Sequence, residues 1–224
     1  LRIIPQHDSP APTSNTVITL GAPTKIPFLD LEKLGQHLAK QLPPLSVPVI
    51  SLFIGGNTRT HRWQSQDMAQ ILQQVKNVSQ TLRASLLVTT SRRTPSAINT
   101  LVKTELAAYE PCKLVILPEE NPPSMNDLVP AMMGLSQLLL ITHDSISMVS
   151  EAASSGKKVI VILDPPAHRG KHGRMITSLR RGGYLQVSDI ASLETVMTQT
   201  LEERIPSPVL QDHVRVQQAL QRLL

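Results

Sequence analysis

Two short polar segments of the chain contain residues that could hold an anionic ligand, and each follows a run of aliphatic residues. In Gly55-Gly56-Asn57, two adjacent glycines would let the backbone approach a ligand closely and direct amide groups at it. In Ser91-Arg92-Arg93-Thr94, two hydroxyls and two guanidinium groups stand where a helix is expected to begin, which favours phosphate binding. The alternatives are a tight turn for the first segment and a solvated charged turn for the second.

A third segment, from His143 to Ala153, places three serines and two carboxylates at a predicted strand-to-helix turn. Serine hydroxyls and helix amides could hold a diphosphate, and a carboxylate further into the helix could accept hydrogen bonds from ribose hydroxyls. Helix capping by a single serine is the alternative, and it would account for only one of these groups. The candidate ligand-binding residues here are Asp144, Ser145, Ser147, Met148, Ser150 and Glu151.

A basic stretch forms the fourth candidate segment. Between Asp164 and Asp189 the sequence contains no acidic residue but five arginines and lysines. Such a stretch attracts anions, whether a phosphorylated ligand, a nucleic-acid backbone or an acidic lipid. Lys171 and Arg174 stand near the predicted start of a helix and could clamp phosphates. The alternative is a solvated surface loop.

Composition and missing motifs exclude several classes of function. Aromatic residues make up only 2% of the chain, which argues against a nucleic-acid partner read by base stacking. The single cysteine, Cys112, excludes an intrachain disulfide and any multi-cysteine metal site. The histidines lack a metal-ligand spacing, so neither a metal nor a separate cofactor is expected. The sequence also lacks the GxxxxGK[ST], GxGxxG and GxSxG loops of nucleotide triphosphatases, usual dinucleotide sites and serine hydrolases.

Strand-like and helix-like patterns alternate along the chain. The strand runs are mostly continuous and apolar, which is typical of a parallel sheet covered on both faces. Between them, apolar residues recur three and four positions apart, as in helices. This alternation predicts an α/β fold with a doubly wound, Rossmann-like parallel sheet. The predicted strands are Val17–Leu20, Val47–Ile54, Ser85–Thr90, Lys113–Leu117, Gln137–Thr142, Lys158–Leu163 and Tyr184–Val187.

Several predicted helix ends carry chemical markers. Ser65 and Thr94 are expected to cap the helices that follow them, the latter with Pro95 at the first helical position. Gly156 and the pair Gly182-Gly183 stand where helices are expected to end in a left-handed residue.

Changes in composition divide the chain into three parts. Residues 1–45 contain short strand–turn units separated by proline-rich spacers, and we interpret them as the end of an N-terminal domain followed by an interdomain linker. Residues 46–204 form the main α/β domain. Residues 205–224 carry a helical pattern, and this C-terminal helix is expected to pack back onto the first part.

The four polar segments, in this order, resemble those of the mitochondrial-fission ELM-type (elongated mitochondria) family, a group of glycosyltransferase-like proteins found in bacteria and plants. The similarity spans most of the chain, and its most specific strings are Ser91-Arg92-Arg93-Thr94-Pro95 and the serine-rich segment. It rests on Ile54-Gly55-Gly56 with Trp63, Thr89 to Pro95, Thr142 to Ala152, Gly156 to Val159 and Lys171 to Gly183.

The resemblance implies a two-domain glycosyltransferase of the GT-B type, in which residues 46–204 bind a nucleotide sugar. The glycines and Ser91-Arg92-Arg93 would then line the diphosphate, and the serines with Glu151 would hold phosphate and ribose. The catalytic base is not identified, although His7 and Asp8 would lie near the interdomain cleft. The acceptor would be a glycan or a lipid-linked molecule. The protein would be cytoplasmic in a bacterium or associated with an organelle in a plant.

Two other functions remain open at this stage. The resemblance to plant members also implies an adaptor that organises an organelle, with peripheral membrane association and without turnover. The basic stretch alone would permit binding to a nucleic-acid backbone, but the net charge of only +5 and the few aromatics count against it.

Overall fold

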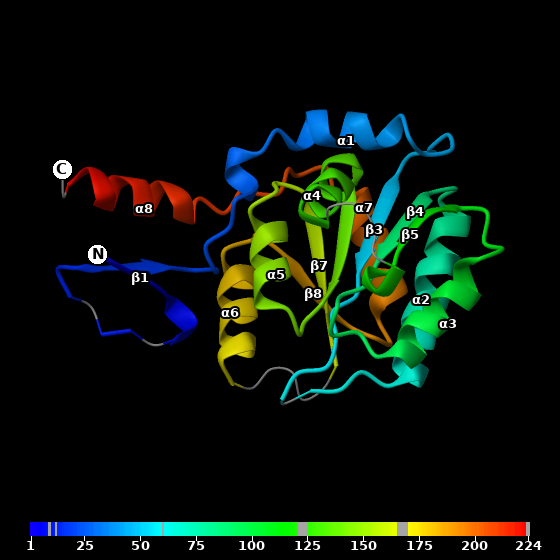
Figure 1. The fold of residues 1–224 in the computed structure, drawn as a ribbon, viewed down its shortest axis with the longest axis horizontal. Coiled ribbons are helices and arrows are strands. Elements are labelled where there is room, and N and C mark those ends of the chain that lie inside the picture. Colours follow the sequence, from blue (N-terminus) through cyan, green and yellow to red (C-terminus); the bar gives the residue numbers. More distant parts are fainter. Residues whose placement is uncertain (9, 12, 60, 121–124, 165–169, 223–224) are drawn as a thin grey trace.

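A parallel β-sheet of six strands forms the centre of the protein (Figure 1). The structure is a computed structural model, and it describes all residues except 9, 12, 60, 121–124, 165–169 and 223–224. Neighbouring strands are parallel, in the order β5-β4-β3-β6-β7-β8. The strands are β3 (Val49–Phe53), β4 (Ser85–Thr89), β5 (Cys112–Ile116), β6 (Leu138–Thr142), β7 (Lys158–Leu163) and β8 (Gln186–Asp189).

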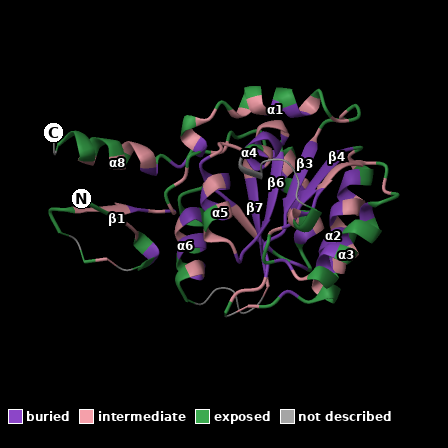
Figure 2. Ribbon diagram, in the orientation of Figure 1, coloured by how far each residue is buried: buried purple, intermediate pink, exposed green. Residues whose placement is uncertain are grey.

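Helices cover both faces of this sheet, which confirms the predicted doubly wound α/β fold. One face packs against α2 (Ser65–Thr81), α3 (Ser96–Leu106) and α7 (Leu193–Glu202). The other packs against α4 (Met125–Leu135), α5 (Ile146–Ala153), α6 (Gly170–Arg181) and, above α4, α1 (Leu31–Ala39). The inner strands β3, β4, β6 and β7 are buried almost throughout and the edge strands β5 and β8 only in part, whereas the outer faces of the helices are exposed (Figure 2).

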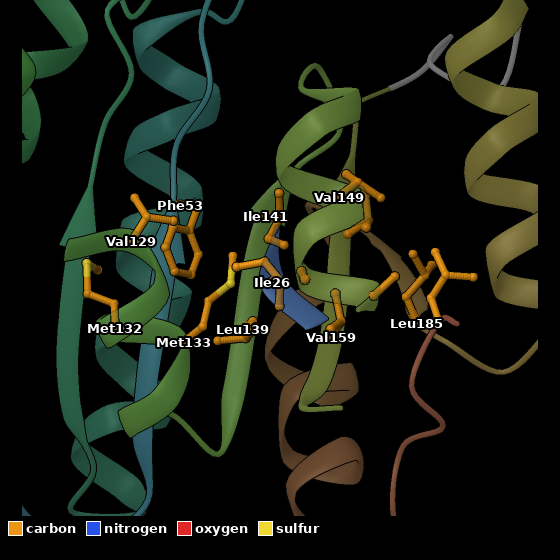
Figure 3. Packing of buried hydrophobic residues seen from close by; sticks show 14 of the residues in the cluster. Ile26, Phe53, Val129, Met132, Met133, Leu139, Ile141, Val149, Val159 and Leu185 are labelled. Carbon is orange, nitrogen blue, oxygen red and sulfur yellow. The ribbon is translucent and has the colours of Figure 1, made fainter. Parts of the chain in front are cut away.

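Successive residues of each strand contribute to the two apolar layers in turn. On β6, for example, Leu138 and Leu140 pack with α2 and α7, and Leu139 and Ile141 pack with α4 and α5. Because side chains alternate between the faces of a strand, a continuous apolar run is needed to fill both layers. Figure 3 shows the second layer, where Phe53 of β3 lies beside Val129 of α4.

The strand order reverses at β3. The chain passes from β3 to β4 and β5 in one direction and then returns to place β6 on the other side of β3. In open α/β sheets, ligands bind beyond the carboxyl ends of the strands at such a reversal. The segments that follow β3, β4 and β6 are therefore the ones that the fold brings together.

The two ends of the chain meet beside the main sheet (Figure 1). A small parallel sheet of β1 (Arg2–Pro5) and β2 (Thr16–Thr19) contacts α8 (Asp212–Gln221), so the C-terminal helix packs onto the first part as expected. The carboxylate of Asp212 accepts hydrogen bonds from the amides of Leu20 and Gly21 at 3.1 and 2.8 Å. Among the helices that lie in the described ranges, none is long and apolar enough to cross a membrane.

Some predicted boundaries are wrong, and local hydrogen bonds explain why. Helix α2 begins at Ser65 itself, after Gln64, so the Ser65 hydroxyl does not cap it. Helix α3 follows Pro95, because the hydroxyl of Thr94 is engaged elsewhere. Strand β8 begins two residues later than predicted, since the Tyr184 amide still donates to the carbonyl of Leu179 at the end of α6. Gly156 and Gly183 do adopt the predicted left-handed conformation, with φ of +70° and +75°.

Helix α1 belongs to the packing of the main body, since it lies directly on α4 (Figure 1). The helices approach through two glycines, and a Cβ on Gly134 would lie 1.9 Å from the carbonyl oxygen of Leu31. A Cβ on Gly35 would lie 2.9 Å from the backbone of Gly134. The backbones of α1 and α4 can therefore approach this closely only because Gly35 and Gly134 have no side chains.

We expect Gly134→Ala to lower the free energy of unfolding by about 1–3 kcal/mol, because α1 must move away from α4. Gly35→Ala should lower it less, since its Cβ meets a less severe overlap. Both substitutions add the same helix propensity, so that contribution cancels in the comparison. Urea unfolding of the two variants measures the difference, and an equal or reversed order would contradict this account of the contact.

Candidate functional site

A cavity of about 250 Å³ lies beyond the carboxyl ends of β3, β4 and β6, where the strand order reverses. Its apolar floor consists of Phe53, Val129 and Ile141, which belong to the core shown in Figure 3. Its rim carries polar groups from separate segments: Gly55, Ser91, Arg92, Ser145 and Glu151, together with Lys25 from the segment before α1. The structure therefore brings the glycine, arginine and serine segments to one cavity.

The turn after β3 is built around the carboxylate of Asp144. This carboxylate accepts hydrogen bonds from the Gly56 amide at 2.8 Å, the Trp63 indole at 2.9 Å and the Thr142 hydroxyl at 2.8 Å. Arg93 Nη2 lies 3.5 Å from it, and the Asp144 side chain is fully buried. The residue thus holds together the ends of β3 and β6.

Both glycines of this turn are required by close contacts. A Cβ on Gly55 would lie 2.1 Å from Asp144 Oδ2, and a Cβ on Gly56 would lie 2.1 Å from the carbonyl carbon of Arg93. The amide of Gly55 donates to the Thr142 hydroxyl at 2.7 Å, and that of Asn57 to the Arg93 carbonyl at 3.1 Å. With Gly56 bound to Asp144, all three amides have partners within the protein. The expectation that they point at a ligand is wrong, because the turn uses them to attach itself to β6 and to the next loop.

The segment after β4 presents one arginine to the cavity and uses its other polar groups internally. Thr94 is buried, and its hydroxyl accepts from the Ser91 amide at 2.8 Å and contacts the Gly55 carbonyl. The Ser91 hydroxyl accepts from the Arg93 amide at 3.2 Å. Arg92 is exposed and lines the cavity without an ion pair to any described residue. Its guanidinium is therefore available to an anionic ligand.

The start of α5 supplies a hydroxyl and a carboxylate. Ser145 caps the helix, since its hydroxyl accepts from the Met148 amide at 3.4 Å, and it also lines the cavity. Glu151, six residues after Ser145, lines the cavity with Met148 and Lys25. Burial raises the pKa of Glu151 above its usual range, and the positive charge of Lys25 opposes this change.

The other serines of this segment lie outside the cavity. Ser150 is fully buried, and its hydroxyl donates to the Ile146 carbonyl at 2.8 Å and accepts from the Ala22 amide at 2.9 Å. It thereby attaches the segment before α1 to α5. Ser147 is exposed on the surface of α5.

The two candidates on α6 lie apart from the cavity and bind the N-terminal segment. Lys171 Nζ lies 2.8 Å from Asp8 Oδ1, and Arg174 donates to the carbonyl of His7 at 2.8 Å. Both residues therefore secure η1 (Gln6–Asp8) against α6. Two other basic residues of this stretch, His168 and Arg169, lie outside the described residues.

A cluster of three aromatic rings, those of His61, Trp63 and His143, lies beside Asp144. The ring of His61 contacts those of His143 and Trp63, with centroids 4.4 and 4.7 Å apart. Burial, followed by the neighbouring His61, lowers the pKa of His143 to about 4. His143 is therefore neutral at physiological pH. Among the described residues, no group of three or more histidines, cysteines or carboxylates is arranged to hold a metal ion.

The fifteen candidates thus fall into three sets. Six line the cavity: Gly55, Ser91, Arg92, Ser145, Met148 and Glu151. Others form its frame, namely Gly56, Asn57, Arg93, Thr94, Asp144 and Ser150, while Ser147, Lys171 and Arg174 lie elsewhere. Sequence reasoning assigned no binding role to other residues of the wall, among them Lys25, Thr90, Pro118, Val129 and Pro130.

Comparison with known proteins identifies relatives of this chain. The sequence profile of the family described as Mitochondrial fission ELM1 matches residues 1–223. The mitochondrial fission protein ELM1 of Arabidopsis thaliana is 27% identical over 151 residues, which is 67% of this chain and 34% of the plant protein. An uncharacterized protein of Rickettsia prowazekii (strain Madrid E) is 30% identical over 156 residues, or 67% of this chain and 39% of that protein.

The fold is also similar to that of a solved enzyme. A UDP-GlcNAc 2-epimerase from Neisseria meningitidis superimposes with a TM-score of 0.62 at 15% identity, over 95% of this chain and 57% of the enzyme. At this identity the similarity concerns the fold, and the sequence matches to the two relatives cover little more than a third of their lengths. Because the family profile matches nearly the whole chain, the protein belongs to the mitochondrial fission ELM1 family.

Proposed function

We propose that the cavity binds the nucleoside diphosphate part of a nucleotide sugar, and that the whole protein transfers the sugar to an acceptor. The observation that carries this proposal is the convergence of Arg92, Lys25, Ser145 and Glu151 on one cavity at the reversal of strand order. Two cationic side chains and a helix start suit a diphosphate, and a carboxylate suits the hydroxyls of a ribose. Apolar walls suit a nucleobase.

The chemistry of sugar transfer fits this set of groups. When the bond between the sugar and the diphosphate breaks, negative charge develops on the departing diphosphate. Arg92, which no described carboxylate neutralises, would stabilise that charge electrostatically. The structurally similar epimerase is bound to UDP-GlcNAc, which makes UDP-GlcNAc a sensible first ligand to test.

A thermal-shift screen with UDP-, GDP- and ADP-linked sugars tests the proposal, and CMP-linked sugars, which carry a single phosphate, serve as the comparison. At about 100 times its dissociation constant, a bound ligand adds about 2.7 kcal/mol of stability. For a chain of this size, that corresponds to a rise in Tm of about 5–10 °C. If none of the three diphosphate-linked classes raises Tm, the proposal is wrong.

Arg92→Ala should abolish the shift while leaving the unliganded protein folded, because Arg92 is exposed and makes no ion pair with a described residue. The matched control is Arg62→Ala, which removes another exposed arginine that does not line the cavity. A full shift in Arg92→Ala would remove the diphosphate role assigned to this residue.

The family description supports a second candidate, an adaptor in organelle fission that binds the same ligand without turnover. Incubation of the full-length protein with saturating sugar nucleotide, followed by measurement of the released nucleoside diphosphate, distinguishes the transferase from the adaptor. Release of nucleoside diphosphate supports a transferase. Binding without hydrolysis or transfer supports the adaptor.

A further inference from the structure

Two consecutive threonines at the end of β4 line the cavity but differ in how their hydroxyls are bonded. Thr89 and Thr90 are both nearly fully buried, with 2% and 3% of their surfaces exposed. The Thr89 hydroxyl donates to the carbonyl of Ile116 at 3.2 Å. The Thr90 hydroxyl is buried and has no hydrogen-bond partner.

This missing partner sets Thr90 apart from the other hydroxyl residues of the wall. Ser91, Thr142 and Ser145, in addition to Thr89, each form a hydrogen bond within the protein. Buried polar groups in native proteins nearly always have a partner, so an exception calls for a partner from outside the chain. Because Thr90 lines the cavity, rotation about its χ1 bond would let the hydroxyl meet a molecule that fills it.

The surroundings of Thr90 indicate which part of a ligand would reach it. Pro118, which follows β5, and Val129 and Pro130 on α4 give this end of the cavity apolar walls. Glu151 follows β6, and β3 separates β6 from β4. Two strand spacings amount to about 10 Å, so the carboxylate and the threonine serve different parts of one ligand. Apolar walls with a single polar group fit the flat faces and polar edge of a nucleobase.

We propose that the Thr90 hydroxyl contacts the polar edge of the nucleobase and contributes to base recognition. The inference rests on the proposed nucleotide-sugar function and assigns the base to the end of the cavity between β4, β5 and α4. A hydroxyl can both donate and accept, so it can pair with a carbonyl, a ring nitrogen or an amino group of the base.

The test compares Thr90→Val with Thr89→Val, two isosteric changes at adjacent positions. Isothermal titration measures binding of UDP, GDP, ADP and inorganic pyrophosphate, and thermal unfolding measures the stability of the unliganded protein. Thr90→Val should raise the Kd of the nucleotide that binds best about tenfold and leave the Kd of pyrophosphate unchanged. Its Tm should stay constant or rise by about 2 °C, because the substitution removes an unpaired buried hydroxyl.

Thr89→Val should lower the Tm, because it leaves the carbonyl of Ile116 without its side-chain donor. It should raise the Kd of the nucleotide less than Thr90→Val does, because the Thr89 hydroxyl is already bonded within the protein. If wild type binds a nucleotide and Thr90→Val binds it equally well, the base contact is wrong and the proposed function stands. If Thr90→Val loses affinity for pyrophosphate to the same extent, the hydroxyl does not serve the base. If wild type binds none of the nucleotides, both the contact and the proposed function are wrong.

Discussion

Asp144→Ala is expected to lower the free energy of unfolding by about 3–5 kcal/mol, the largest loss that we expect from one side chain of the site. The substitution removes a fully buried carboxylate and leaves the Gly56 amide, the Trp63 indole and the Thr142 hydroxyl without their acceptor. Each unpaired buried donor costs about 1–3 kcal/mol. Since a domain of this kind is stable by only about 5–15 kcal/mol, urea unfolding should show the loss clearly.

Asp144→Asn and Asp127→Ala complete the experiment. Asparagine retains one acceptor oxygen, so its loss should be intermediate. Asp127 is exposed on α4, and its removal should change the free energy of unfolding by no more than about 0.5 kcal/mol. The account of the turn would be refuted if Asp144→Ala were no more destabilising than Asp127→Ala.

The fold could be predicted because its signals are local and repeated. Runs such as residues 159–163 of β7 are apolar at every position, and this requires a sheet that is covered on both faces. The boundaries that were wrong depend on single hydrogen bonds, such as that from the Tyr184 amide to Leu179. Tyrosine favours strands, but this preference cannot show that the Tyr184 amide is bonded to the last turn of α6.

The site could be predicted only in outline, because residue type does not reveal which way a side chain faces. Ser145 at the start of α5 and Ser150 within it looked equivalent in the sequence. In the structure Ser145 lines the cavity, whereas Ser150 is buried and accepts a hydrogen bond from the Ala22 amide. Asp144 looked like a ligand-binding group, but its carboxylate is fully buried and accepts three hydrogen bonds from within the protein. Lys25 reaches the cavity through tertiary packing of the segment before α1, for which the sequence holds no local signal.

Stability should fall steeply as the pH is lowered from about 6.5 to 4, mainly because of His143. Burial holds the pKa of His143 at about 4 in the folded protein, against an ordinary value of 6.5. Between these values the unfolded chain takes up a proton that the folded protein does not, so acid favours unfolding. The difference corresponds to about 3 kcal/mol, which is retained in full above pH 6.5 and lost progressively down to pH 4.

His143→Phe tests this assignment, because it retains a ring against His61 and Trp63 but cannot be protonated. Urea unfolding at pH 7.0 and 4.5 should show a smaller difference for His143→Phe than for wild type. His37→Gln, at an exposed position of α1, should leave the wild-type difference unchanged. Burial also lowers the pKa of His7 and His172, so part of the slope should remain in His143→Phe. If the free energy of unfolding changed equally with pH in wild type and His143→Phe, His143 would be protonated as readily in the folded protein as in the unfolded chain. The burial of His143 in the ring cluster beside Asp144 would then be refuted.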